Sequence, residues 1–182
     1  MATKTDYAFK LLQVVSWIIF IGLCIEAGGF VFNAFITLFV TPEGASKFWV
    51  QVDLWALLQH NQSHFVQIAV LMIIVSILKA IMFYIILDIL GNKKLDLSSP
   101  FDKVVGPPVF SIAYLALGIG LFSYWGMKLT HWLASQGVQM PDIQHLKFGG
   151  SDVWLFMGVT LLVFAKIFRK GIELQSDNEL TV

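Results

Sequence analysis

Four long apolar segments constrain this chain more than any other feature of its sequence. They cover about residues 9–40, 64–90, 104–134 and 152–168. The hydrocarbon core of a bilayer is about 30 Å thick, so a helix needs about 20 residues to cross it. Backbone groups find no water there and must form hydrogen bonds within each segment. The sequence therefore predicts an all-α integral membrane protein, a bundle of four transmembrane helices in a single domain over residues 1–182.

The composition agrees with this fold class. Of the 182 residues, 57% are hydrophobic and 13% are charged, whereas soluble domains carry about 25% charged residues. The formal net charge is zero, so no basic surface indicates direct nucleic-acid binding. The first apolar run is about 30 residues long, much longer than the core of a signal peptide, and we expect an uncleaved first span.

Lysine and arginine residues near the ends of the spans predict the orientation of the chain. One side carries eight of them: Lys4, Lys10, Lys93, Lys94, Lys103, Lys166, Arg169 and Lys170. The other side carries three: Lys47, Lys128 and Lys147. Because positively charged flanks stay in the cytoplasm, we expect both termini, and the tail over residues 169–182, to be cytoplasmic.

Two further patterns concern packing. Residues 46–60, SKFWVQVDLWALLQH, have apolar side chains at helical spacing and predict a short interfacial helix on the outer leaflet. Small residues in the first and third spans should let helices approach one another closely. These small residues are Gly28, Gly29, Ala116, Gly118 and Gly120.

Glu26 and Lys79 are charged residues inside apolar segments and need a physical explanation. The first span rises from the cytoplasm and the second descends, so the two residues come to similar depths and could pair. The pair would either hold two helices in register or line a ligand or ion pathway; alternatively, the side chains extend toward the lipid surface. Asn33 and Ser76 lie on the same two helices, where they either line a ligand site or hydrogen-bond between helices.

All four histidines, His60, His64, His131 and His145, fall on the expected outer side. His60 and His64 are four residues apart, a spacing that suits a metal ion if the segment is helical. The histidines could instead sense external pH, or they are ordinary interfacial residues. Because no Glu or Cys completes a recognised metal motif, we predict no bound cofactor.

Residues 167–182, IFRKGIELQSDNELTV, resemble the C-terminus of the DUF2975 family of small bacterial membrane proteins. Residues 78–90, LKAIMFYIILDIL, and residues 95–105, LDLSSPFDKVV, are similar to the family's second span and its Pro-Phe cytoplasmic link. The resemblance covers four spans and implies a multi-pass protein of the bacterial inner membrane. It also implies a neighbouring gene for a small helix-turn-helix regulator, and hence such a transcription factor as a partner.

The tail has two interpretations. Arg169 and Lys170 would lie at the inner lipid surface, where anionic lipids attract them, and the remainder would be a solvated flank. In the second interpretation, part of the tail forms a strip that docks a soluble protein. That strip would consist of Glu173, Gln175, Asp177, Asn178, Glu179 and Leu180.

The sequence contains no phosphate-binding loop and no nucleophile paired with a base, so we expect a protein that is not an enzyme. The preferred function is sensory or regulatory, with the bundle reporting a signal to a cytoplasmic partner. The alternative is a small carrier, channel or proton pathway that uses Glu26 and Lys79, as a homo-oligomer since four helices leave little room for a pore. A third hypothesis is a membrane enzyme or cofactor-binding protein that uses the outer histidines.

Overall fold

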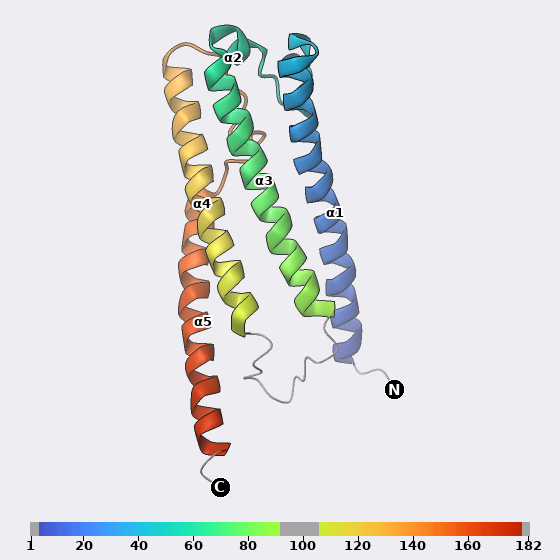
Figure 1. The fold of residues 1–182 in the computed structure, drawn as a ribbon, viewed down its shortest axis with the longest axis vertical. Coiled ribbons are helices and arrows are strands. Elements are labelled where there is room, and N and C mark those ends of the chain that lie inside the picture. Colours follow the sequence, from blue (N-terminus) through green and yellow to red (C-terminus); the bar gives the residue numbers. More distant parts are fainter. Residues whose placement is uncertain (1–3, 92–105, 180–182) are drawn as a thin grey trace.

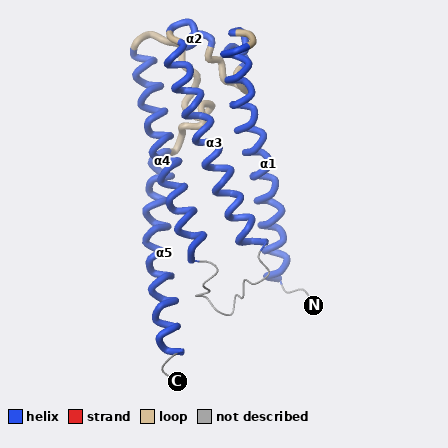
Figure 2. The backbone as a smooth tube through the Cα atoms, viewed as in Figure 1, coloured by secondary structure: helices blue, strands red, loops and turns tan. Residues whose placement is uncertain are grey.

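The computed structural model describes residues 4–91 and 106–179, and every regular element of this part is helical (Figures 1 and 2). The four long helices are α1 (Lys4–Phe39), α3 (Gln62–Gly91), α4 (Gly106–Ser135) and α5 (Ser151–Glu179). Two short elements, η1 (Pro42–Lys47) and α2 (Trp55–His60), lie between α1 and α3. The predicted all-α class with four long helices is therefore confirmed.

Each long helix contains a stretch that is apolar and long enough to cross a membrane. These stretches are Lys10–Phe39, Gln62–Gly91, Pro107–Ser135 and Ser151–Ile172. Many of their large apolar side chains point outward, including Leu11, Phe32, Tyr114 and Phe156. Each square ångström of apolar surface left in water costs about 25 cal/mol, so lipid is the solvent that suits this surface. The chain is a multi-pass membrane protein.

The helices pack in the order α1, α3, α4, α5, and within the described residues α1 has no direct packing contact with α5. The arrangement is therefore an open row, which Figure 1 shows running from α1 on the right to α5 on the left. The start of α1 and the end of α5 lie at one end, here called the terminal end (Figure 1). The opposite end carries α2 and is called the α2 end.

Helix α5 does not begin level with its neighbours. The α4–α5 loop, residues 136–150, leaves α4 at the α2 end and runs back among the helices, so that α5 begins partway along α4 (Figure 1). At the terminal end α5 extends beyond the other helices and remains helical to Glu179. The span predicted from the sequence ends at residue 168, before the basic pair Arg169 and Lys170. Since no proline interrupts residues 169–179, the helix continues past the last apolar turn.

Glycines bring α4 and α5 close together. A Cβ on Gly120 would lie 2.9 Å from the backbone nitrogen of Leu155, and a Cβ on Gly158 would lie 2.9 Å from that of Leu117. The close approach predicted at Gly120 is confirmed. Gly28, in contrast, has nothing within 4 Å of its Cβ position, so it does not serve helix packing.

The connection between α1 and α3 folds against the helices, and the helix expected over residues 46–60 is shortened to α2. Before α2, Trp49 and Val52 exchange backbone hydrogen bonds of 3.3 and 3.0 Å and close a tight turn. Within this turn Gln51 has a φ of 62°, which no right-handed helix accommodates. The apolar spacing therefore marks a buried connection, with a helix of only six residues.

An aromatic cluster explains why burial prevails over helix formation here. Phe48 has no exposed surface; its ring stacks on Phe30 of α1 at 6.1 Å and meets Phe65 of α3 edge-on at 5.7 Å. Trp49 lies against Gly29, where any side chain would overlap the indole. Aromatic pairs of this kind contribute about 0.5–1.5 kcal/mol each beyond the area they bury. The first connection is thus part of the protein core.

The α4–α5 contact gives the first prediction. Gly120→Ala should destabilise the protein by about 1–3 kcal/mol because the helices must separate to admit the new methyl group. Gly22→Ala is the matched control, because a Cβ at Gly22 meets nothing within 4 Å. The free energy of unfolding of each variant is measured in detergent micelles. Equal stability of the two variants would contradict the packing described.

Candidate functional site: an ionic cluster at the α4–α5 loop

The α4–α5 loop brings Lys147 against Glu26 of α1. Lys147 Nζ lies 2.7 Å from Glu26 Oε2, and the Ser76 hydroxyl of α3 donates a hydrogen bond to Glu26 Oε1 at 3.2 Å. The side chain of Glu26 keeps only 15% of its exposure. Each oxygen of this carboxylate therefore has a partner from a different part of the chain, one of them through a short charge-assisted contact.

Lys79 contacts the same loop through its backbone. Its Nζ donates to the carbonyl oxygen of Lys147 at 3.4 Å, a long contact compared with the usual 2.7–3.2 Å. The ammonium group also lies 5.7 Å from the ring centroid of Trp154 on α5, within the range of a cation–π interaction. The sequence suggested a direct pair between Glu26 and Lys79; in the structure Lys147 occupies that position.

We call this group of residues the Glu26 cluster: Glu26, Ser76, Lys79, Lys147 and Trp154. It joins α1, α3, the α4–α5 loop and α5. Along α1, Glu26 lies about 20 Å from Phe39 and about 24 Å from Lys10, at 1.5 Å per residue. These two residues bound the apolar stretch of α1, so the cluster lies deep within the membrane-spanning region.

A non-helical segment at this depth must have its polar backbone groups satisfied within the protein. Backbone amides of the loop donate to nearby loop acceptors: Gln144 N to Asp142 Oδ1, Leu146 N to Asp142 O, Lys147 N to Gln144 O and Phe148 N to Ile143 O, at 2.7–3.1 Å. Lys79 supplies a donor for the carbonyl of Lys147. Leu146 and Phe148 have no exposed surface. The loop around Lys147 therefore has features of a re-entrant segment, namely local partners for several backbone groups and two buried apolar side chains.

The backbone of Lys147 is strained. Its φ is 67°, a left-handed conformation that costs a residue with a side chain about 1–2 kcal/mol. The neighbouring Phe148 ring fills the space beside Gly126 of α4, where a Cβ would lie 2.6 Å from the ring. The ion pair, the Lys79 contact and this buried ring together hold the strained residue in place. Such strain often accompanies functional sites, because the surrounding contacts must offset it.

The cluster contains more positive than negative charge. It has two ammonium groups and one carboxylate, and within the described residues the ion pair of Glu26 with Lys147 is the single carboxylate contact within 4 Å of either lysine. Unpaired charge within a membrane is costly, and such residues commonly lie on ion or ligand pathways. The arrangement could bind an anion, pass a proton, or exist in two states that differ in the position of the loop.

The other polar residues predicted from the sequence lie outside the cluster. Asn33 is half-buried, about two helical turns beyond Glu26 on α1. At the α2 end, the rings of His60 and His64 stack with centroids 5.9 Å apart, and His64 meets Trp132 edge-on at 5.4 Å.

The remaining histidines are separate from this pair: His131 is exposed on α4, and His145 is half-buried in the α4–α5 loop. In residues 4–91 and 106–179, no group of three His, Cys, Asp or Glu side chains could hold a metal ion. A role of the histidines in sensing pH stays a prediction.

The predicted docking strip falls where the side chains are not described. Glu173, Gln175, Asp177, Asn178 and Glu179 lie on the last turns of α5, which is helical there. Leu180 lies outside the described residues. Docking of a soluble protein on this strip stays a prediction.

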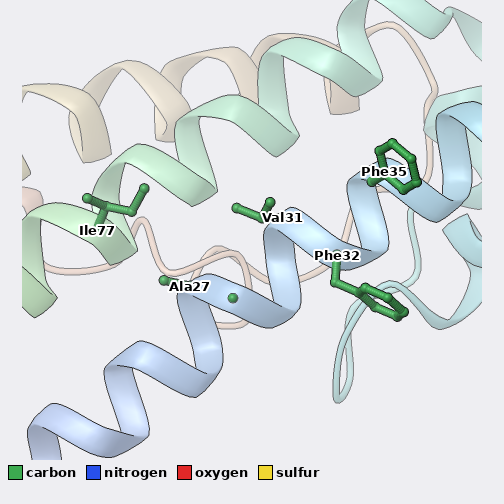
Figure 3. A pocket seen from close by; sticks show the side chains of 6 residues that line it. Ala27, Val31, Phe32, Phe35 and Ile77 are labelled. Carbon is green, nitrogen blue, oxygen red and sulfur yellow. The ribbon is translucent and has the colours of Figure 1, made fainter.

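An apolar groove of about 450 Å³ lies between α1 and α3. It is lined by Ala27, Gly28, Val31, Phe32, Phe35 and Ile77 (Figure 3). Every lining residue is apolar and belongs to a membrane-spanning stretch. The groove suits a lipid acyl chain and adds no polar chemistry to the site.

Sequence reasoning assigned Lys147 to the outer charges and missed its role in the cluster. A local signal was present, because Lys147 stands between the apolar residues Leu146 and Phe148 and is followed by Gly149 and Gly150. A solvent-exposed loop has no need for a large apolar residue on each side of a lysine.

The fold and the cluster define a multi-pass α-helical membrane protein whose α4–α5 loop folds back among its helices. Residues 40–182 match the sequence profile of the family described as "Protein of unknown function (DUF2975)", and the chain belongs to this family. The match begins after α1, so it includes Lys79 and Lys147 but not Glu26, and it covers three of the four spans expected from the resemblance. No match was found among the curated proteins or the solved structures.

A double-mutant cycle gives the second prediction. Glu26→Gln and Lys147→Gln should show a coupling free energy of about 1–3 kcal/mol in unfolding experiments, because residues in direct contact do not contribute additively. The coupling of Glu26→Gln with Lys79→Gln should be smaller, since those side chains do not form a direct ion pair.

Glu43→Gln provides the control cycle with Lys147→Gln, because Glu43 is an exposed residue of η1. Its coupling with Lys147 should be near zero. A coupling of Glu26 with Lys79 that equals or exceeds its coupling with Lys147 would show that the cluster is arranged differently.

Proposed function

We propose that this protein is a non-enzymatic regulatory component of the bacterial inner membrane, and that docking of the α4–α5 loop is its switch. The observation that carries this proposal is a strained re-entrant loop fixed by the Glu26 cluster. In this proposal the terminal end lies in the cytoplasm. The placement of Lys147 within the helices supports that orientation, because it leaves two flanking lysines, Lys47 and Lys128, on the opposite side.

The switch has a docked and a released state of the loop. In the docked state, the ion pair and the burial of Phe148 offset the strain at Lys147. A signal that favours the released state by a few kcal/mol would change the populations. Gly150, with a φ of 71°, stands directly before α5 and provides a hinge between loop and helix.

Helix α5 connects the switch to the terminal end of the molecule. It begins at Ser151, four residues after Lys147, and its 29 residues span about 43 Å. Its helix packing is on α4, and the contact of Lys79 with Trp154 links it to α3, so a movement of the loop has few other helix contacts to overcome. A helix-turn-helix regulator, the partner that the family resemblance implies, would read the end of α5 and the tail.

Co-purification from native membranes tests this function and gives the third prediction. We expect wild-type protein to retain a small helix-turn-helix protein and a variant lacking residues 171–182 to lose it. Glu26→Gln should change the amount retained by several fold, because it releases Lys147 from its carboxylate. Quantitative mass spectrometry measures the retained partner, with Glu43→Gln as the control.

Two results would contradict the proposal. One is the absence of any helix-turn-helix protein from the wild-type sample. The other is an equal amount of partner with Glu26→Gln and Glu43→Gln, which would mean that the cluster does not control the tail.

The excess ammonium group of the cluster favours a second candidate, a pathway for anions or protons in a homo-oligomer. The fourth prediction belongs to this candidate: reconstituted protein would move chloride or protons across liposomes, and both Lys79→Gln and Glu26→Gln would abolish the flux. Flux measured with a pH-sensitive or chloride-sensitive dye checks it. A wild-type flux no greater than that of protein-free liposomes would remove this candidate.

A further inference from the structure

A cavity of about 290 Å³ lies where the two connections at the α2 end meet. The first connection contributes Gln51, Asp53, Trp55 and Ala56, and the α4–α5 loop contributes Gln139, Met140 and Pro141. The cavity is separate from the Glu26 cluster but is built partly from the same loop. Its volume is at the lower limit for organic ligands, which indicates a small molecule or a single head group.

The lining has the chemistry to hold a cation. Asp53 is the one ionisable residue in the lining, so the local charge is negative. The indole of Trp55 adds an aromatic face of the kind that binds ammonium groups. The carboxamides of Gln51 and Gln139 offer oxygen acceptors for the N–H or O–H groups of such a cation.

The carboxylate of the exposed residue Asp53 is positioned by the backbone at the start of α2, the helix that carries Trp55. The backbone N–H of Trp55 donates to Asp53 Oδ1 at 2.8 Å, and within the described residues Asp53 Oδ2 has no protein partner. Close by, the turn that carries Gln51 is closed by the paired backbone bonds of Trp49 and Val52. Gln51 itself has a left-handed φ of 62°. This cavity therefore combines a pre-positioned carboxylate oxygen with a strained backbone, a combination common at binding sites.

We propose that this cavity binds a small organic ammonium group, supplied either by a free amine such as choline or ethanolamine or by the head group of phosphatidylethanolamine. This proposal deepens the proposed function because it names the class of signal. Binding of the ammonium group is independent of the proposed function, whereas the response of the α4–α5 loop rests on it. A ligand that contacts Gln139 to Pro141 contacts the segment that leads to Lys147. Occupancy would then change the balance between the docked and released loop.

The fifth prediction uses the full-length protein in nanodiscs of phosphatidylglycerol, which has no amine. Choline and ethanolamine should bind saturably in calorimetry, whereas 3,3-dimethylbutanol, the neutral isostere of choline, should bind at least tenfold more weakly. Asp53→Asn should weaken ammonium binding at least tenfold, because it removes the charge while its carbonyl oxygen still accepts the Trp55 N–H. Glu43→Gln, outside the cavity, should bind as the wild type does.

A second arm distinguishes the two sources of the ammonium group. In nanodiscs containing both lipids, native mass spectrometry should show whether phosphatidylethanolamine is retained by the wild type and lost from Asp53→Asn. Binding of free amines alone assigns the site to a soluble ligand, and retention of the lipid alone assigns it to a head group. Failure of both, or binding that is equal for the neutral isostere or for Asp53→Asn, overturns the proposal. Thermal unfolding of each variant verifies that it is folded, and Trp55→Leu provides a second variant that should also weaken binding.

Hydrogen exchange at residues 143–148 separates this proposal from the proposed function. Ammonium binding that alters the protection of these amides supports both. Binding without such a change supports the site and contradicts the loop switch as its response. If nothing binds while Glu26→Gln still changes partner retention, the site is refuted and the proposed function stands.

Discussion

The ion pair between Glu26 and Lys147 links parts of the molecule that helix packing leaves apart. Helix α1 packs on α3, and α5 packs on α4, so the row of helices has two free edges. The α4–α5 loop connects these edges because its lysine reaches α1 while its chain continues into α5. Removal of either partner would leave a charge in a largely apolar surrounding, which is far more costly than the loss of a surface pair.

The range of each interaction decides whether a local stretch of sequence displays it. The spans were predictable because the demand of lipid for apolar side chains and internal hydrogen bonds acts on each segment by itself. The position of Lys147 depends on distant partners, Glu26 on α1 and the Gly126 surface on α4, which no local pattern displays. Charge counting therefore placed it in an outer loop.

The first connection shows the same limit in another form. The spacing of its apolar residues predicts a helix on the outer leaflet, whereas the structure buries Phe48 and Val52 within the protein and forms a helix only over Trp55–His60. Phe48 contacts Phe30 and Phe65 only if the chain turns before α2.

In the candidate site, the polarity of Glu26, Ser76 and Lys79 within apolar segments made them recognisable from the sequence. Trp154 was not, because it stands at the start of the fourth apolar segment, where the sequence favours an ordinary aromatic residue of the membrane surface.

The distance along the chain between the two partners of the ion pair has a consequence for biogenesis. Glu26 enters the membrane with the first helix, while Lys147 is synthesised roughly 120 residues later, at about 5–20 residues per second. For that interval the carboxylate lacks its cation, and Ser76, which follows by 50 residues, is the earlier of its two structural partners to emerge. The ion pair forms only after the third long helix, α4, has been synthesised, so the contact that connects the two edges of the helix row is made late in assembly. Until then, the nascent protein exposes an acidic group within the bilayer, a feature by which a membrane chaperone or quality-control protease could distinguish unfinished chains from finished ones.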